Sequence, residues 1–132
     1  MRPRELALTI LIVEAQALIS LNIEDVVRSM GARVIGCAAR LSEALPLIET
    51  VSWDAALLDL RLGQGEMVYP AAERLRARDV PFAFVTGWDG DIDARFANVP
   101  VLTKPFAEAE LVTCLRMLVG KMPRRISERQ AA

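Results

Sequence analysis

The sequence predicts an α/β fold in which a doubly wound, five-stranded parallel sheet carries helices on both faces. Four apolar runs, at residues 8–13, 55–58, 82–85 and 99–102, have the length and composition of strands that are buried on both sides. Segments with helical periodicity separate these runs, an order of elements that is typical of parallel sheets. A polar residue follows each run, so the predicted strands place polar side chains at one common edge of the sheet.

The first half of the chain is predicted to form two strand–helix units. Apolar residues at helical spacing between Ile19 and Met30 indicate a helix after the first strand, and Gly31 is suited to end it. Residues 33–37 are predicted to form a short second strand. Ser42 is expected to cap a helix over residues 43–49, which leads into the strand at 55–58.

The second half continues this alternation. Residues 63–65 (Gly-Gln-Gly) predict a loop, and residues 66–78 are expected to be helical with Pro70 in the first turns. The stretch 87–98 is polar, so a helix there, around residues 92–96, is expected to be short. The final helix is predicted from one apolar face, which contains Leu111, Leu115, Leu118 and Val119 and fades at Gly120. Right-handed crossovers then give the flavodoxin-like strand order 2-1-3-4-5.

Composition narrows the classes of protein to which the chain can belong. Its 132 residues, 53% of them hydrophobic, suit one domain over residues 1–120 with a polar tail at 121–132 that is expected to be flexible. The net charge of −1 argues against nucleic-acid binding. No apolar segment is long enough to span a membrane, so a cytoplasmic location is expected. Histidine is absent, and Cys37 and Cys114 lack metal-ligand spacing, so both thiols are expected to serve packing.

Four polar residues are expected to converge at the carboxyl edge of the sheet. Glu14, Asp59 and Thr86 end or follow the first, third and fourth strands, and Lys104 follows the fifth. Open α/β sheets place their sites where the strand order reverses, which here lies between Glu14 and Asp59. Carboxylates hold a hard divalent cation, while a hydroxyl and an ammonium bind phosphoryl oxygens. The pattern therefore predicts a site for one phosphoryl group together with a hard divalent cation.

The segments around these residues resemble response-regulator receiver domains. Three of them are similar to the stand-alone receivers called FATGUY after a Phe-Ala-Thr-Gly-hydrophobic-Tyr motif: Pro81-Phe82-Ala83-Phe84-Val85-Thr86-Gly87-Trp88, Met67-Val68-Tyr69-Pro70 and Lys104-Pro105-Phe106. The likeness extends from about Leu8 to Val119. It implies a bacterial single-domain response regulator, not an enzyme, that accepts phosphate from a sensor histidine kinase and acts through contact with a downstream protein. An HWE-type kinase is one candidate donor.

The resemblance also implies a role for each site residue. Asp59 is expected to accept the phosphate, Thr86 to be the switch hydroxyl and Lys104 to bind the phosphoryl group. Glu14, Asp59 and the backbone carbonyl of Arg61 are expected to ligate Mg²⁺. The peptide bond between Lys104 and Pro105 is expected to be cis.

Three residues depart from the receiver pattern. Receivers usually carry a second acidic residue after the first strand, where this chain has Ala15, so Mg²⁺ is expected to bind weakly. Arg61 stands two residues after Asp59, and one hypothesis is that its guanidinium partly replaces the charge of the metal by pairing with Asp59. Val101 stands where many receivers have an aromatic switch residue. Signalling is therefore expected to involve Gly87, Trp88 and the loop that follows them.

These departures leave a second function open. A pseudo-receiver would be a constitutive interaction module that accepts no phosphate; Ala15 and Val101 favour it, whereas Asp59, Thr86 and Lys104 favour the phosphorylated regulator. A haloacid-dehalogenase-type phosphatase would need an aspartate where Arg61 stands, and a flavodoxin would need a hydroxyl- or glycine-rich loop after the first strand, so neither fits. A homodimer through the first or the last helix is a further alternative that composition does not decide.

Overall fold

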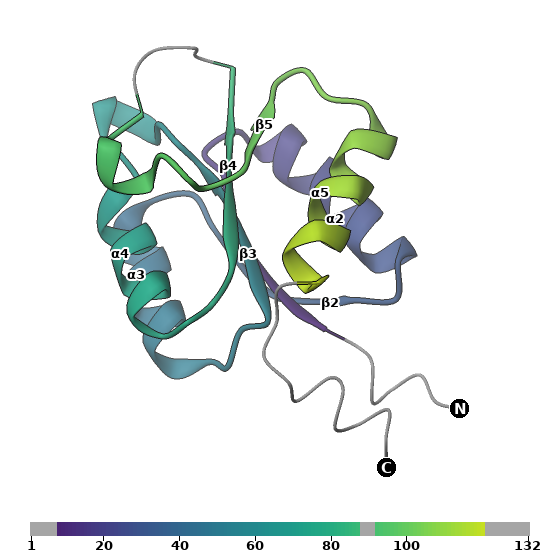
Figure 1. Ribbon diagram of the computed structural model, residues 1–132, viewed down its shortest axis with the longest axis horizontal. Helices are drawn as coiled ribbons and strands as arrows, with labels where there is room; N and C mark the ends of the chain where they lie inside the picture. Colours follow the sequence, from purple (N-terminus) through teal and green to yellow (C-terminus); the bar gives the residue numbers. More distant parts are fainter. Residues whose placement is uncertain (1–7, 88–91, 121–132) are drawn as a thin grey trace.

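The computed structural model describes residues 8–87 and 92–120, and it confirms the predicted doubly wound sheet. Five parallel strands lie in the order β2-β1-β3-β4-β5. Helices α2 and α5 cover one face of the sheet, and α3 and α4 cover the other (Figure 1). The strands are β1 (Thr9–Val13), β2 (Arg33–Ala38), β3 (Ala55–Asp59), β4 (Phe82–Thr86) and β5 (Val101–Thr103); the helices are α2 (Ala17–Ser29), α3 (Leu41–Thr50), α4 (Tyr69–Ala77) and α5 (Glu108–Gly120), with 3₁₀ turns η1 (Gly63–Gly65) and η2 (Ala94–Phe96).

The central strands β1, β3 and β4 are buried along their whole length. Their side chains alternate between two hydrophobic cores: Ile12 and Leu57 pack beneath α2 and α5, whereas Leu58 and Phe84 pack beneath α3 and α4. Because both faces are covered, charged side chains are tolerated only at the strand ends. Among the described residues, no helix has both the length and the apolar character needed to cross a membrane.

Two helices begin at different residues from those predicted. Ser42 lies inside α3 and makes no cap; Arg40 occupies the cap position. The side chain of Glu66 accepts the N–H of Leu41 at 3.1 Å, and Glu43 accepts the N–H of Ala39 at 2.8 Å, so carboxylates satisfy the backbone donors at this helix start. Helix α4 begins at Tyr69, not at residue 66, because the backbone of residues 66–68 hydrogen-bonds to the segment at 60–62.

The connection from β4 to β5 contains only a short helical turn in its described part, as predicted. This turn, η2, is held by Phe96, which is 1% exposed and packs with Tyr69, Phe82 and Phe84. Tyr69 stacks on Phe96, and its hydroxyl oxygen accepts the N–H of Asp93 at 2.9 Å. Strand β5 begins at Val101, two residues later than predicted, because the N–H of Val99 already donates to the carbonyl of Phe96 at 3.1 Å.

The hydroxyl of Tyr69 joins η2 to α4, and this link can be tested. Tyr69→Phe is expected to lower the free energy of unfolding by about 1 kcal/mol, because the Asp93 N–H loses its acceptor while the ring packing remains. Urea denaturation measures the change. Tyr69→Leu is the control and should cost more, because it also removes the stacked ring. Equal stability of Tyr69→Phe and wild type would contradict the role of the hydroxyl.

Candidate functional site

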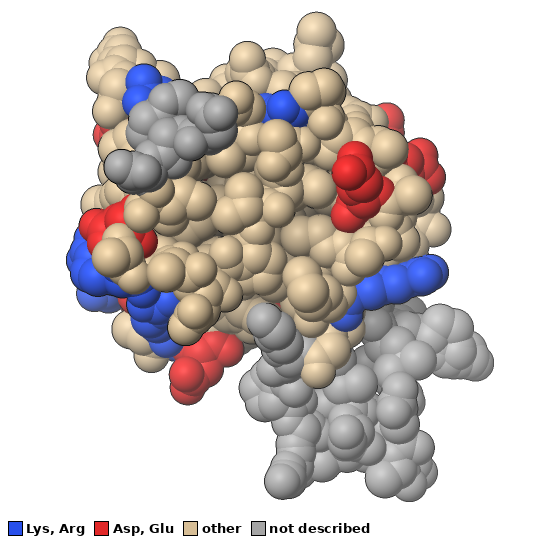
Figure 2. Space-filling model, turned by 45° about the horizontal axis from the view of Figure 1, so that its top comes forward, with Lys and Arg blue, Asp and Glu red and all other residues tan. Residues whose placement is uncertain are grey.

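The four predicted polar residues meet at the carboxyl edge of the sheet. Glu14 follows β1, Asp59 ends β3, Thr86 ends β4 and Lys104 follows β5. Asp59, Thr86 and Lys104 line a cleft of about 530 Å³, and Glu14 lies buried next to it. Figure 2, in which this edge is turned toward the viewer, shows a surface formed mostly by uncharged side chains, with acidic and basic side chains mostly near its margins.

The ammonium of Lys104 lies between the two carboxylates. Its Nζ atom is 3.0 Å from Glu14 Oε1, donates to Glu14 Oε2 at 3.1 Å, and is 3.5 Å from Asp59 Oδ1. It also donates to Gln16 Oε1 at 3.2 Å. The Lys104 side chain is only 14% exposed, so these contacts are shielded from water on most sides. A cation held in this way neutralises two acids that would otherwise repel each other.

Gln16 is a site residue that the sequence analysis missed. Its side-chain oxygen accepts from Lys104, and its backbone N–H donates to Glu14 Oε2 at 2.9 Å. Both contacts depend on the chain turning from β1 into α2, where Gln16 occupies the cap position. The only feature of the sequence that could have pointed to Gln16 was its position two residues after Glu14. A neutral amide at such a position gives no charge pattern that would single it out.

Burial governs the electrostatics of Glu14. Desolvation raises the pKa of its carboxyl to about 7, and the hydrogen bond and charge of the neighbouring Asp59 act in the same direction. The N–H of Gln16 and the ammonium of Lys104 oppose this rise. Glu14 Oε1 lies 3.0 Å from the Lys104 ammonium but accepts no hydrogen bond within the described part of the chain. The contact of this buried oxygen with the ammonium is therefore an ion pair without hydrogen-bond geometry.

Asp59 and Thr86 are fixed by the strands that carry them. Asp59 Oδ2 accepts the backbone N–H of Ala15 at 3.3 Å. The carbonyl of Thr86 accepts the N–H of Lys104 at 2.9 Å, so the hydroxyl residue and the lysine belong to one hydrogen-bonded pair of strands. The Lys104–Pro105 peptide bond is cis, as the resemblance implied.

No protein-family model matches the chain, but solved structures do. SdrG from Sphingomonas melonis Fr1 is 38% identical, with a TM-score of 0.78 over 90% of this chain and 99% of that one. The receiver domain of the sensor histidine kinase PA1611 from Pseudomonas aeruginosa PAO1 is 32% identical, with a TM-score of 0.75 over 87% of this chain and 99% of that one. This chain belongs to the response-regulator receiver domains.

Other relatives agree with this assignment at lower identity. The receiver domain of the PhyR response regulator from Erythrobacter litoralis is 29% identical, with a TM-score of 0.77 over 88% of this chain and 92% of that one. The transcriptional regulatory protein PdtaR of Mycobacterium tuberculosis is 25% identical over 116 residues, which is 85% of this chain. The receiver spans only 57% of the length of PdtaR, so what the whole of PdtaR does is not carried over.

The residues that depart from the usual receiver pattern occupy distinct places. Ala15 and Arg61 line the cleft, and a Cβ atom at Gly87 would lie 3.5 Å from the Cβ of Lys104, an ordinary contact. Val101 is 44% exposed, on the same sheet face as Phe84. Trp88 lies outside the described residues.

The donor set suits a small divalent cation that keeps much of its own water. Within residues 8–87 and 92–120, no group of three or more acidic, cysteine or histidine side chains is placed to hold a metal. Two carboxylates remain, those of Glu14 and Asp59, and Glu14 Oε1 accepts no hydrogen bond within the described residues, although it lies 3.0 Å from the Lys104 ammonium. Mg²⁺ commonly binds through one or two carboxylates and several waters. The residues present therefore fit Mg²⁺, with water expected where a second acidic residue would otherwise bind.

Ala15→Asp is expected to tighten Mg²⁺ binding by about tenfold, because it adds a carboxylate next to the existing pair. Isothermal titration calorimetry measures the affinity directly. Ala15→Asn is the matched control, since it adds similar volume without charge and should gain much less. An unchanged dissociation constant for Ala15→Asp would show that residue 15 does not face the metal site.

Proposed function

We propose that this receiver accepts a phosphoryl group from a sensor histidine kinase on Asp59 and signals by contact with a downstream protein. The observation that carries the proposal is the position of Lys104, whose ammonium is 3.5 Å from Asp59 Oδ1 and is anchored by Glu14 and Gln16. A cation at that distance is placed to meet phosphoryl oxygens attached to Asp59. This proposal includes the residue roles and the cytoplasmic location. It also includes the assignment of residues 1–120 to the receiver and of residues 121–132 to a tail.

The proposed transfer is a single displacement at phosphorus. An Asp59 carboxylate oxygen attacks the phosphorus of a phosphohistidine, the new O–P bond forms as the N–P bond breaks, and the electron pair leaves with the imidazole, which takes up a proton. Lys104 and the Thr86 hydroxyl stabilise the charge on the phosphoryl oxygens. When bound by Glu14, Asp59 and the Arg61 carbonyl, Mg²⁺ supplies charge neutralisation between the acceptor and the incoming group.

The relatives support parts of this proposal. PA1611 is described with a magnesium ion coordinated in its active-site cleft, and SdrG has been solved in a BeF3-activated conformation at 41% identity to this chain. We extend both properties to this receiver. Members of the family are signalling modules, so the only catalytic activity proposed for this chain is its own phosphorylation and dephosphorylation at Asp59. Asp59 and Lys104 both line the cleft, where a bound Mg²⁺ and a phosphoryl group would have to lie.

Intact-protein mass spectrometry tests the acceptor. Wild type and Asp59→Ala are incubated with Mg²⁺ and either acetyl phosphate or an autophosphorylated HWE-type kinase. One added phosphate on wild type alone is the expected result. A second candidate, the phosphorylation-independent pseudo-receiver, is favoured by Ala15 and by the exposed Val101 at the switch position. Folded wild type that gains no phosphate from either donor would establish that candidate instead.

The start of α2 offers a surface for the kinase next to the cleft. Leu18 is 82% exposed and Leu21 is 55% exposed, while Gln16 and Ile19 from the same turns line the cleft itself. Large apolar side chains of this exposure, beside the acceptor, suit contact with an apolar protein surface. We place the donor kinase on this surface.

Leu18→Glu should therefore slow phosphotransfer from the kinase by about tenfold while leaving labelling by acetyl phosphate unchanged, because only the larger donor touches α2. Phosphotransfer reactions quenched at successive times, run with each donor, give the two rates. Met117→Glu is the matched control: it also charges an exposed apolar residue, but late in α5. Equal slowing with both donors would mean that Leu18 acts on the site and not on docking.

A further inference from the structure

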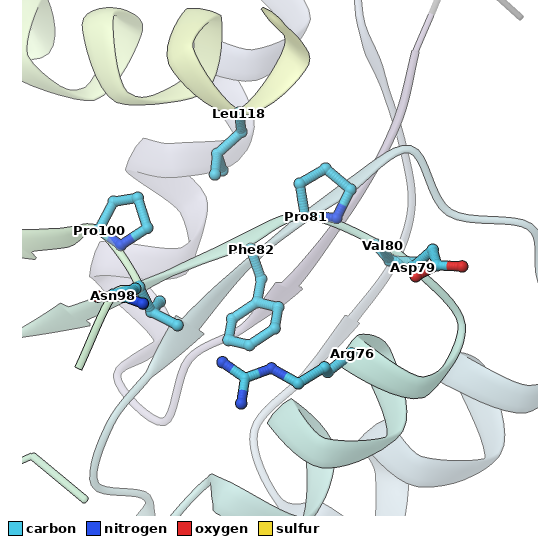
Figure 3. A pocket seen from close by; sticks show the side chains of 9 residues that line it. Arg76, Asp79, Val80, Pro81, Phe82, Asn98, Pro100 and Leu118 are labelled. Carbon is cyan, nitrogen blue, oxygen red and sulfur yellow. The ribbon is translucent and has the colours of Figure 1, made fainter. Parts of the chain in front are cut away.

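A second cleft lies at the opposite edge of the sheet from Asp59. Its volume is about 390 Å³, and its walls come from the turn between α4 and β4, the residues before β5, and the end of α5. Figure 3 shows Leu118 reaching down from α5 toward Phe82, with Pro81 and Pro100 on either side. These apolar side chains form an indentation large enough for one or two side chains of another segment.

The walls of this cleft are held by contacts of their own. The guanidinium of Arg76 lies 4.5 Å from the centre of the Phe96 ring and donates to the carbonyl of Arg95 at 2.8 Å. Proline precedes both β4 and β5, which limits the backbone freedom at each strand start. At the rim, Asp79 has a φ of 58° and is exposed. Within residues 8–87 and 92–120, its carboxylate has no hydrogen-bond or ion-pair partner.

The chain itself contains a segment that matches this cleft. The buried face of α5 contains Leu111, Leu115 and Leu118, at spacings of four and three residues, and four residues after Leu118 the sequence has Met122. The described part of α5 ends at Gly120, only two residues past a wall of the cleft. In the sequence, Met122 thus continues the apolar spacing of α5, and Pro123 is a residue that disfavours a regular helix.

Charge favours the same segment. Met122-Pro123 is followed by Arg124 and Arg125, while the rim of the cleft carries the carboxylate of Asp79, which has no partner among the described residues. A methionine side chain adapts well to irregular apolar gaps. Because the segment is tethered within a few residues of the cleft, its effective concentration there is high, on the order of millimolar or above.

We propose that residues 121–125 dock into this cleft, with Met122 against Phe82, Pro100 and Leu118, and with Arg124 or Arg125 beside Asp79. This amends the expectation of a flexible tail for its first five residues only. The cleft is remote from Asp59, so docking does not depend on the proposed phosphorylation.

Paramagnetic broadening in the full-length chain tests the proposal. A nitroxide is attached at Ser127→Cys in a Cys37→Ser background; Cys114 is buried and stays unmodified. The amide signals of Phe82 and Val99 should lose most of their intensity, whereas those of Ala15 and Gly87, at the opposite edge, should not. Met122→Asp should restore the signals at least twofold, and the conservative Met122→Leu should leave them broadened.

Several outcomes would overturn the proposal. Broadening confined to Leu8 and Ala32 would place the segment in the small apolar gap between α2 and α5 instead. Broadening of Phe82 and Val99 that persists when nitroxide-labelled chains are mixed with separate, unlabelled isotope-enriched chains would identify a second copy as the occupant. Unbroadened Phe82 and Val99 signals, or signals equally broadened in Met122→Asp, would show that Met122 does not dock there.

A charge exchange tests the polar half of the contact. Asp79→Lys should reduce the broadening at Val99 a few-fold, because it places a positive charge beside the two arginines. Changing Arg124 and Arg125 to glutamate in the same chain should restore it. Restoration supports the pairing, and a charge-reversed chain that behaves like Asp79→Lys alone would remove Asp79 from the proposal.

Discussion

Lys104→Met is expected to slow phosphorylation of Asp59 by about 10²-fold, the usual cost of removing one well-placed donor from a site of developing charge. The methionine keeps much of the length of the side chain but has no charge and no donor. In the variant, no positive charge from residue 104 then neutralises the phosphoryl oxygens at the position where the ammonium now lies, 3.5 Å from Asp59 Oδ1. Single-turnover labelling with acetyl phosphate measures the rate without any effect on kinase docking.

Lys104→Arg is the matched control for this prediction. It keeps the positive charge and should retain most of the rate, although the guanidinium is larger than an ammonium held among Glu14, Gln16 and Asp59. The fold of each variant is checked by circular dichroism, because the loss of the cation leaves two buried carboxylates unpaired. A folded Lys104→Met that labels at the wild-type rate would contradict the role given to the ammonium.

Much of the fold could be predicted because the residues that determine it form patterns that are visible within a short stretch of sequence. The strands at β1, β3 and β4 are buried on both faces, so their sequences contain little but apolar residues and stand out without an alignment. Gly31 adopts a φ of 86° just after α2, a conformation that glycine reaches at little cost, and it was identifiable for that reason. Once the strand order is known, the positions of Glu14, Asp59, Thr86 and Lys104 at one edge follow from topology.

The elements predicted wrongly depend on partners distant in sequence. The start of α3 is satisfied by Glu66, which lies 25 residues from Leu41, so the nearby Ser42 was the wrong candidate for the cap. Residues 66–68 have helical character in sequence, yet their backbone hydrogen bonds go to the segment at 60–62. The side chain of Gln16 enters the site through its bond to Lys104, 88 residues away. Such pairings arise from tertiary structure and leave no periodic pattern.

The raised pKa of Glu14 predicts how stability depends on pH. The carboxyl has a pKa of about 7 in the folded protein against 4.5 in the unfolded chain, so between these values the folded state binds the extra proton. The contribution of Glu14 to the free energy of unfolding should therefore be complete below pH 4.5 and be lost as the pH rises through 7. The loss expected between pH 5 and pH 8 is on the order of 2 kcal/mol.

Glu14→Gln isolates this contribution. Glutamine resembles the protonated carboxyl in shape and does not titrate, so the variant should match wild type below pH 4.5 and exceed its stability near pH 8 by about 3 kcal/mol. Urea denaturation at several pH values gives both curves. Parallel curves for the two proteins would mean that Glu14 keeps an ordinary pKa. The Lys104 ammonium would then outweigh burial, which is the opposite of the balance inferred from the 1% exposure of the Glu14 side chain.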